Sequence, residues 1–237
     1  MHLSAYDDAA PIARSFGHGA LEIVVARVSA GPEAVRASEA VLSAEELQRA
    51  SRLPYDRHRQ RFVIARAGLR ELLGARLGER PEAVELVYGP HGKPALAARF
   101  ASADLRFNLS HSDDLAVYVF SRGCEVGVDV EAIRALRDAD QIAARFFSSR
   151  EYEAYLGLDP HDRPLAFLNC WTRKEAFVKA LGDGVFHRRD RFDVSLSPGE
   201  PARILRVGNA PGEECGWRLE SFSPAAGYVA AVVTEVR

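Results

Sequence analysis

Short runs of the chain alternate hydrophobic and polar residues, and this period of two predicts strands with one buried face. The clearest run is VGVDVE near the middle, where valines alternate with glycine and acids. Turn residues such as Pro and Gly separate most of the runs, as is typical of short strands. The sequence predicts strands at residues 21–28, 85–88, 106–109, 115–121, 124–131, 192–196, 203–207, 217–222 and 228–236.

Two features of these runs bear on how the strands pair. Only Arg122 and Gly123 separate residues 115–121 from residues 124–131. We therefore expect these two strands to form a β-hairpin. The last run, YVAAVVTEV, is similar in character to LAVYVFS at 115–121, which indicates two similar halves.

Other segments repeat hydrophobic residues every three or four positions, which is the spacing of one helix face. Ser43 with Glu46, and Ser148 with Glu151, match the capping box that begins a helix. Pro164 suits a first helical turn, and Gly182 suits the end of the same helix. The sequence predicts helices at residues 43–52, 56–77, 138–147 and 164–182, and one that begins at Ser148.

The strand at 124–131 carries the first candidate chemistry. Alternation places Asp129 and Glu131 on one face, roughly 6.5–7 Å apart along the strand. Carboxylates at that distance repel each other unless a proton or a cation lies between them. Gly127 lacks a side chain, so another group can approach the backbone there. The pattern leaves two interpretations open: a cation site, or a strand end whose acids face water.

The helix at 164–182 carries a second set of polar residues. Trp171, Glu175 and Lys179 are four residues apart and share one stripe of the helix. Such a Glu–Lys pair can be an ordinary surface pair, worth about 0.3–0.5 kcal/mol. Lys174, however, falls on the side that should be buried. It must therefore extend toward solvent or bind a charged partner.

Composition limits the classes of function. The chain has 237 residues, 47% hydrophobic and 27% charged, which is typical of a soluble globular protein with one or two domains. A formal net charge of −2 argues against nucleic acid or an anionic membrane as a partner. No secretory signal is recognisable at the start, and three cysteines (Cys124, Cys170 and Cys215) lack metal-ligand spacing. We expect a cytoplasmic protein without a membrane span.

The use of basic residues is uneven. Of the 31 basic residues, 28 are Arg, and the lysines are Lys93, Lys174 and Lys179. Lysine is a slim point charge, whereas arginine is a wide planar fork, so these positions could be ones that exclude a guanidinium. With so few lysines, chance could also explain their positions.

The polar side of the helix at 56–77 is rich in arginine and is either a solvated face or a phosphate-binding wall.

Several motifs follow one another through the middle of the chain. They are GKP at 92–94, FNLSHS at 107–112, GVDVE at 127–131, RFFSSRE at 145–151 and WTRKEAFVK at 171–179. In order and spacing the chain resembles the 4′-phosphopantetheinyl transferases, specifically the Sfp-type branch with the W-x-x-K-E-A motif. The joint presence of GVDVE and WTRKEAFVK is what makes the resemblance specific.

The resemblance implies an α+β fold of two pseudo-symmetric lobes, the 4′-phosphopantetheinyl transferase fold. Residues 1–122 would form the coenzyme A side, and residues 123–237 the side of the metal site and the carrier protein. The family moves 4′-phosphopantetheine from coenzyme A to a serine of an apo acyl or peptidyl carrier protein and releases 3′,5′-ADP. The resemblance further implies a monomer and dependence on Mg²⁺.

Site residues carry over from the matching motifs. Asp129, Glu131 and Glu175 match the metal-binding acids, and carboxylate oxygens are ligands that Mg²⁺ prefers. Glu175 is also the candidate base for the serine proton, and Lys179 the cation at the pyrophosphate. The positions that match coenzyme A contacts are Lys93, Ser110 and His111.

The pocket for the 3′-phosphate departs from the family pattern. Glu46 stands where the family can carry a basic residue, and Phe62 stands where a small hydroxyl can be present. The remaining candidates to bind this phosphate are Arg49, Arg61 and Arg66.

Two other functions would use some of the same residues. A Mg²⁺-dependent phosphohydrolase would also need the three acids. It has no need of Lys174 and Lys179, or of the set Ser110, His111 and Lys93. A non-catalytic module that binds coenzyme A or a carrier protein could dispense with the acids.

The basic and apolar segment at 133–147 is the expected carrier-docking surface, because carrier proteins in this family's reactions are typically acidic.

Overall fold

The computed structural model describes residues 21–134, 136–182, 191–208, 210–211 and 216–236. Residues 1–20, in which no secretory signal was recognised, and Cys215 lie outside these ranges. Among the described helices, none is both long enough and apolar enough to cross a membrane.

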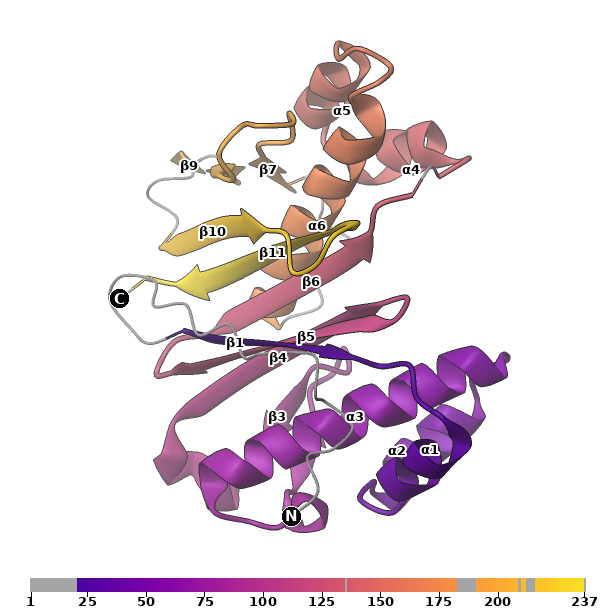
Figure 1. Cartoon of the computed structure of the whole chain (residues 1–237). Helices are drawn as coiled ribbons and strands as arrows, with labels where there is room; N and C mark the ends of the chain where they lie inside the picture. Colours follow the sequence, from indigo (N-terminus) through magenta and orange to yellow (C-terminus); the bar gives the residue numbers. More distant parts are fainter. Residues whose placement is uncertain (1–20, 135, 183–190, 209, 212–215, 237) are drawn as a thin grey trace.

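The N-terminal half places a long helix against a three-stranded sheet, and two shorter helices pack against that helix (Figure 1). Its elements are β1 (Glu22–Arg27), α1 (Pro32–Glu39), α2 (Ala44–Ser51), α3 (Asp56–Leu77), η1 (Pro81–Ala83), β2 (Leu86–Tyr88), β3 (Pro94–Leu96), η2 (Ala98–Ala103), β4 (Leu105–Ser112) and β5 (Leu115–Arg122). Strands β2 and β3 form a separate two-stranded sheet.

The C-terminal half contains a second three-stranded sheet and a second long helix. Its elements are β6 (Val126–Ala132), α4 (Ala139–Phe146), α5 (Ser149–Leu156), α6 (Arg163–Leu181), β7 (Phe192–Val194), β8 (Ile204–Val207), β9 (Ala210–Pro211), β10 (Trp217–Phe222) and β11 (Tyr228–Glu235). Strands β7, β8 and β9 form a small sheet of their own.

The two main sheets share one topology. Their strand orders are β1-β5-β4 and β10-β11-β6, with antiparallel pairing throughout. In each half the first strand pairs with the last strand, and the last strand pairs with the one before it. The long helices, α3 and α6, each lie in the chain between the first strand and that final pair. The expected α+β fold with two pseudo-symmetric halves is therefore confirmed, and β5 and β11 are the equivalent central strands.

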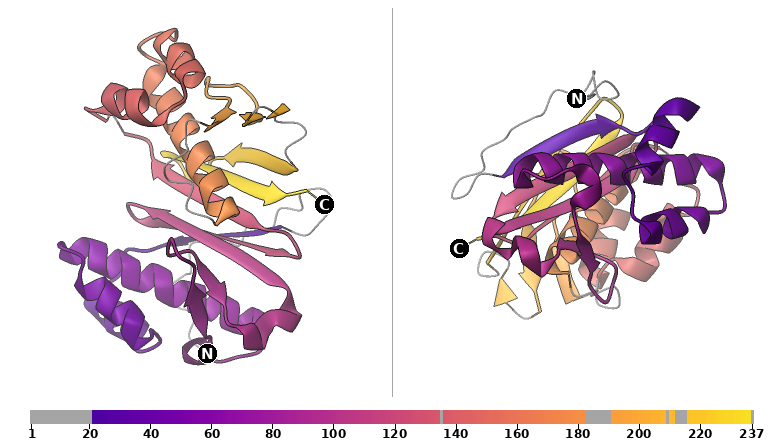
Figure 2. Two further views of the ribbon diagram at one scale, coloured as in Figure 1. Left: turned by 180° about the vertical axis from the view of Figure 1, so that it is seen from behind. Right: turned by 90° about the horizontal axis from the view of Figure 1, so that it is seen from below.

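The sheets stack against each other and the long helices cover their outer faces (Figures 1 and 2). Between the sheets lies a hydrophobic core to which β5 contributes Val117 and Val119, and β6 contributes Val126, Val128 and Val130. A second core joins the opposite face of β5 to α3, and a third joins β11 to α6. Because the valines of β6 face the first sheet, the residues that alternate with them face α6.

The predicted hairpin between residues 115–121 and 124–131 is wrong. Strand β5 pairs with β4 and β1, whereas β6 pairs with β11 in the other sheet. The tight turn is instead between β4 and β5, where Asp113 adopts a positive φ of 47°. Gly123, at φ 74°, carries the chain from one sheet to the other. A short polar link is compatible with either path, so the sequence pattern could not distinguish them.

Other predictions about the elements are largely confirmed. Both capping boxes are present, with Glu46 and Glu151 accepting hydrogen bonds from the backbone of Ser43 and Ser148. Helix α1, which begins at Pro32, was not predicted. Strand β4 is longer than predicted and extends through Ser112.

Gly127 sets the distance between β6 and α6. A Cβ atom at this position would overlap the backbone of Ala176 and Ala180, and would lie 2.9 Å from the Ala180 Cα atom. The expected close approach at Gly127 is therefore that of the helix backbone itself. This contact brings the polar residues of α6 beside Asp129 of β6.

Candidate active site

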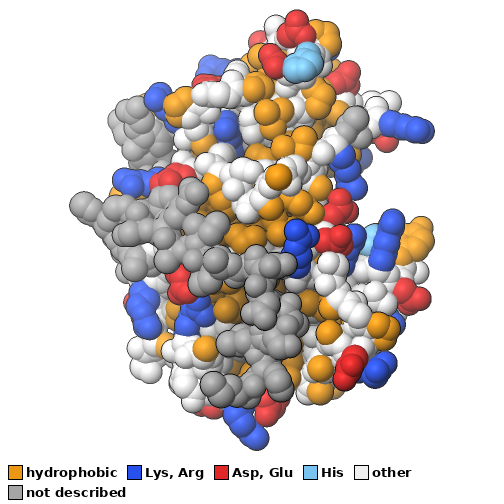
Figure 3. Space-filling view, in the orientation of Figure 1, with side chains coloured by type: hydrophobic (Ala, Val, Ile, Leu, Met, Phe, Trp, Pro, Cys, Tyr) orange, Lys and Arg blue, Asp and Glu red, His pale blue; other side chains and the backbone are white. Residues whose placement is uncertain are grey.

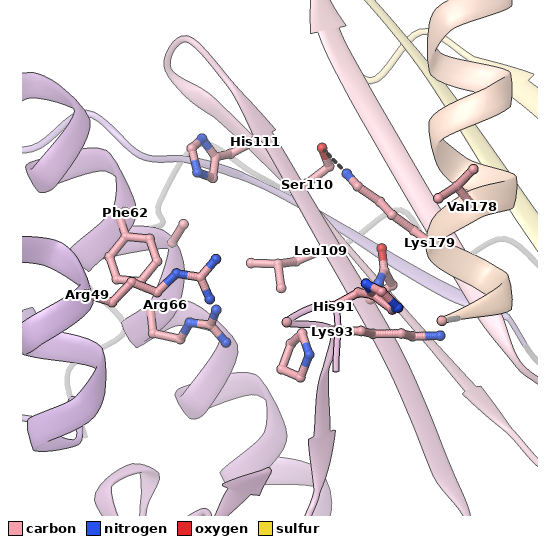
Figure 4. Close-up of a pocket in the computed structure, with 15 residues that line it drawn as sticks. Arg49, Phe62, Arg66, His91, Lys93, Leu109, Ser110, His111, Val178 and Lys179 are labelled. Atoms are coloured by element: carbon pink, nitrogen blue, oxygen red, sulfur yellow. Dashed lines mark hydrogen bonds between the residues drawn. The ribbon is translucent and has the colours of Figure 1, made fainter. Parts of the chain in front are cut away.

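A cavity of about 360 Å³ lies where the two halves meet. Its wall combines α2, α3, the loop before β3, strand β4 and the last turn of α6 (Figure 4). The residues that line it include Arg49, Phe62, Arg66, His91, Lys93, Asn108, Ser110, His111, Val178, Lys179 and Gly182. In Figure 3, acidic, basic and histidine side chains gather at the right edge of the molecule, at the level where the two halves meet.

Side chains of β4 connect the edge of the first sheet to β6. Asn108 accepts a hydrogen bond from the Val128 amide at 3.1 Å. Ser110 Oγ donates to Asp129 Oδ1 at 2.8 Å, and Ser112 Oγ donates to Glu131 Oε2 at 2.7 Å. Every second residue of FNLSHS therefore bonds to the strand that carries GVDVE. Asn108 and Ser112 were not among the predicted site residues, although the motif contains both.

Asp129 and Lys179 form the centre of the acidic side. The Lys179 ammonium lies 2.6 Å from Asp129 Oδ1, 3.0 Å from Ser110 Oγ and 3.2 Å from the Val128 carbonyl. Asp129 is 5% exposed, and its Oδ2 atom is buried without a hydrogen bond. A buried carboxylate oxygen without a donor is costly unless something positive binds to it.

Glu131 and Glu175 lie near this pair. Glu131 follows Asp129 on the same face of β6, and burial raises the pKa of Glu131 while its Ser112 hydrogen bond opposes the rise. Glu175 is almost fully buried on α6, one turn before Lys179. Within the described ranges, the structure holds no group of three or more His, Cys, Asp or Glu side chains already arranged around one metal position.

The opposite side of the cavity is basic. Arg66 is 5% exposed, and its Nε and Nη1 atoms are buried without hydrogen bonds. Its guanidinium lies 5.6 Å from the centre of the Phe62 ring, and the Arg49 guanidinium lies 5.7 Å from the same ring. Burial lowers the pKa of Arg66. An anion in the cavity would oppose this decrease, because it stabilises the charged guanidinium.

Glu46 supports this basic side from behind. Its carboxylate is 1% exposed, accepts a hydrogen bond from Arg70 at 2.7 Å and lies 3.6 Å from Arg66 Nε. Tyr88 donates a further bond to it at 3.3 Å. The acid that departs from the family pattern is therefore neutralised within the protein, largely by Arg70. Tyr88 was missed because it stands outside the quoted motifs.

His111 completes the basic side (Figure 4). Partial desolvation of the ring in the cleft and the nearby cations Lys179, Arg61 and Arg66 lower its pKa to about 4, although the residue is exposed. Part of the imidazole surface remains open to the cavity. The ring is therefore neutral near pH 7 and surrounded by positive charge, as expected beside a site for an anion.

The structure brings together most, but not all, of the predicted site residues. Arg49, Arg66, Lys93, Ser110, His111 and Lys179 line the one cavity, and Asp129 binds two of them. Arg61 instead faces the β4–β5 turn, where it donates to Asp114 at 2.8 Å and lies 3.5 Å from Asp113. Asp113 and Asp114 were not predicted as partners of Arg61.

The ammonium groups of all three lysines bind carboxylate and backbone carbonyl oxygens. Lys174 is 1% exposed and donates to Glu151 and to the Phe192 carbonyl, each at 2.7 Å. The expectation that Lys174 binds a charged partner is confirmed. Lys93 and Lys179 likewise each bind one carboxylate and at least one backbone carbonyl.

Comparisons with known proteins agree with this geometry. A family model described as the 4′-phosphopantetheinyl transferase superfamily matches residues 125–233, and one for the N-terminal region of 4′-phosphopantetheinyl transferases matches residues 30–122. The 4′-phosphopantetheinyl transferase HetI of Nostoc sp. is 40% identical over 193 residues, which cover 81% of this chain and 78% of HetI. The chain belongs to the 4′-phosphopantetheinyl transferase family.

Other family members show similar levels of identity. The transferase AcpT of Escherichia coli K12 is 38% identical over 54% of this chain and 61% of its own length. A 4′-phosphopantetheinyl transferase of Bacillus subtilis is 29% identical over 66% of this chain and 67% of its own. The protein is thus an enzyme that transfers 4′-phosphopantetheine from coenzyme A to a carrier protein. This assignment favours the transferase over the phosphohydrolase and the non-catalytic module.

Proposed function

We propose that the cavity between the halves binds coenzyme A, and that the reaction takes place where Lys179, Asp129 and Glu175 meet. The observation that carries this proposal is the pairing of two unsatisfied groups of opposite charge at the two sides of the cavity. Arg66 has two buried nitrogens without hydrogen bonds, and Asp129 has one such oxygen. A phosphate group of coenzyme A would satisfy the buried nitrogens of Arg66, and a cation would satisfy the buried oxygen of Asp129.

The two halves, residues 1–122 and 123–237, would bind different parts of coenzyme A. The first half would anchor the 3′-phosphate through Arg49, Arg66 and His111, and the second would hold the pyrophosphate near Lys179. Charge-assisted hydrogen bonds to phosphate are stronger than neutral ones, particularly with desolvated donors. Because both walls of the cavity come from one chain, a monomer would be sufficient.

Mg²⁺ is the proposed metal, and the residues present fit it. Asp129 Oδ2 is a buried carboxylate oxygen without a donor, and Glu131 and Glu175 supply further oxygens on neighbouring elements. Such hard ligands suit Mg²⁺, which usually retains waters and binds substrate phosphates as well. A bound Mg²⁺ would neutralise charge on the pyrophosphate.

The chain's own residues would perform the remaining steps. Glu175 takes the proton from the serine hydroxyl, directly or through a water, as the serine oxygen attacks the phosphorus next to pantetheine. The bond from that phosphorus to the bridging oxygen breaks, and 3′,5′-ADP leaves. Lys179 would stabilise the negative charge that develops on the leaving phosphate. Ser110 holds the Lys179 ammonium and the Asp129 carboxylate in a fixed relation.

The carrier protein would dock beside Glu131, on the segment at 133–147. Ile133 is 47% exposed, and Leu136 and Ile142 line a hollow of about 150 Å³ together with Glu131 and Trp171. Basic side chains on the same segment include Arg134, Arg137 and Arg145. An acidic carrier would be attracted by these charges, which mainly affect association rate and salt dependence.

Mass spectrometry of a carrier protein tests the proposal. The enzyme is incubated with coenzyme A, Mg²⁺ and either an apo acyl or an apo peptidyl carrier protein. We expect the mass to increase by one phosphopantetheine group, and chelation of the metal to prevent the increase. Loading at full rate without any divalent metal would contradict the proposed metal site. Reversal of Arg134 and Arg137 to Glu should raise the carrier KM at low salt, and an unchanged KM would reject the docking surface.

A further inference from the structure

Lys93 lines the cavity, but its ammonium group is directed away from the N-terminal half that carries it. Lys93 lies in the loop between β2 and β3. Its Nζ atom donates to Glu125 Oε2 at 2.9 Å, to the Ala180 carbonyl at 3.1 Å and to the Val126 carbonyl at 3.4 Å. An ammonium group has three donors, so these acceptors of the C-terminal half can satisfy all of them.

Glu125 is held from the first half by two cations. Its Oε2 atom binds Lys93, and its Oε1 atom accepts from Arg106 Nε of β4 at 3.0 Å. The backbone amide of Glu125 in turn donates to Glu235, at the end of β11, at 3.3 Å. Glu125 therefore links the loop before β3, strand β4 and the second sheet. It lines a separate hollow on the far side of Lys93 and is not among the residues that line the main cavity.

The two carbonyl groups that Lys93 binds belong to the elements that carry the proposed active-site residues. Ala180 directly follows Lys179 in the last turn of α6, where backbone carbonyls lack helical partners. Val126 begins β6, three residues before Asp129. The stem of Lys93 also passes close to Gly182, which ends α6 with a positive φ of 69°. A side chain there would contact the lysine Cδ atom at 3.3 Å.

We propose that Lys93, through its ion pair with Glu125, is a positioning residue that fixes the end of α6 and the start of β6 relative to the first half. Through these bonds it sets the distance between Lys179 and Asp129. This inference rests on the proposed function of those two residues. It differs from the role implied by the family resemblance, in which the lysine contacts coenzyme A directly.

The two roles predict opposite results for Glu125. If Lys93 contacts a coenzyme A phosphate, Glu125 competes for the ammonium, and Glu125→Gln should leave coenzyme A binding unchanged or strengthen it. If Lys93 positions the active site, Glu125→Gln should reproduce the defect of Lys93→Met, which retains the aliphatic stem.

A double-mutant cycle separates these outcomes. Carrier loading is measured by mass spectrometry for the parent, Lys93→Met, Glu125→Gln and the double variant. We expect kcat to fall about tenfold in Lys93→Met and at least about threefold in Glu125→Gln, with the double variant no worse than Lys93→Met alone. The KM for coenzyme A should change less than about threefold in each case.

The opposite pattern would overturn the inference. A KM for coenzyme A raised tenfold or more by Lys93→Met, with Glu125→Gln neutral or favourable, would show direct contact with the ligand. Calorimetric titration of coenzyme A into each variant gives the same answer without catalysis, and thermal unfolding identifies any variant that does not fold. Glu33→Gln, an exposed acid on α1, serves as the matched control.

Failure of the inference can be distinguished from failure of the proposed function. Absence of carrier loading by the parent enzyme would reject the proposed function itself. Normal loading by the parent, with additive effects of the two substitutions, would reject only the positioning role of Lys93. Partial rescue by Glu125→Asp relative to Glu125→Gln would support the ion pair specifically, and a Glu125→Asp variant no better than Glu125→Gln would count against it.

Discussion

The two halves of the molecule use one scaffold for opposite purposes. In the first half, β1 turns Val24 and Ala26 toward α3, and its first residue, Glu22, pairs with an arginine in the last turn of that helix. In the second half, the equivalent strand β6 turns Gly127 and Asp129 toward α6. The middle of the helix-facing side therefore holds core residues in β1 and a carboxylate in β6, whereas the carboxylate of β1 lies at the end of its strand.

The long helices differ in the same way. Helix α3 presents Arg66 to the cavity, whereas α6 presents Lys179 beside the acid of its own sheet. Arg66 Nε and Nη1 thus have no hydrogen bond to an acid, although Glu46 lies 3.6 Å from Nε. The second half keeps its cation and its acid together. Under the proposed function, one repeated topology would provide an anion anchor in the first half and a catalytic centre in the second.

The largest effect should come from Asp129, the buried acid of β6 that binds Lys179. Asp129→Asn retains the shape but removes the charge, so carrier loading should fall by about a hundredfold or more. Glu131→Gln should be less damaging, because a Mg²⁺ site can replace one carboxylate with water. The rates are measured by mass spectrometry at saturating Mg²⁺. Loading at the parent rate by Asp129→Asn would contradict the assignment.

Lys179 should be nearly as sensitive, even to a conservative change. Its ammonium lies within 3.2 Å of three oxygen atoms, a space that a wide guanidinium does not match. We expect Lys179→Arg to lose almost as much activity as Lys179→Ala, on the order of tenfold to a hundredfold. An Arg variant with most of the parent activity would reject the steric explanation for the rarity of lysine.

Stability should distinguish the two strand–helix contacts. Gly127→Ala places a methyl group against the backbone of α6, so it should lower the free energy of unfolding by about 3 kcal/mol or prevent folding. Val24→Ala on β1 only removes methyl groups at a partly buried position and should cost about 1 kcal/mol. Urea denaturation of both variants measures the difference. Equal effects would show that α6 can move away from β6 at little cost.

Much of this contrast between the halves could be predicted from the sequence. The alternation around Asp129, the capping boxes and the Glu175–Lys179 spacing are local patterns, and local patterns specify elements and faces. The need for close approach at Gly127 was also predicted, although not the identity of the approaching helix. Strand pairing depends on long-range contacts, which is why the hairpin at Gly123 was assigned wrongly.

The partners of the charged residues were the harder part. Arg61 was expected in the cavity, but the true β4–β5 turn provides it with Asp113 and Asp114. Arg70, which neutralises Glu46, has no distinguishing pattern in the sequence. Which of several arginines on one helix remains available to a ligand depends on where distant acids lie, and a single sequence does not contain that information in local form.

A smaller effect is expected for pH. The pKa of His111 is about 4 in the folded protein, below the roughly 6.5 of an unfolded chain. The unfolded chain therefore binds this proton first, and stability should decrease as pH falls from about 6.5 to about 4. In His111→Ala the decrease in Tm across this range should be smaller, although only modestly, because the ring is partly open to solvent. An equal or steeper decrease in the variant would contradict the assignment.

The central claim is that the anchor for coenzyme A and the catalytic acids lie in different halves, and calorimetric titration tests it most directly. Coenzyme A is titrated without metal into the parent, Arg66→Met and Asp129→Asn, with Arg61→Met as the matched arginine control. We predict about tenfold weaker binding for Arg66→Met, since a charged bond to phosphate is worth roughly 1.5–3 kcal/mol. Arg61→Met and Asp129→Asn should bind nearly as the parent does. Binding that is unchanged in Arg66→Met, or weakened equally by all three substitutions, would contradict the account.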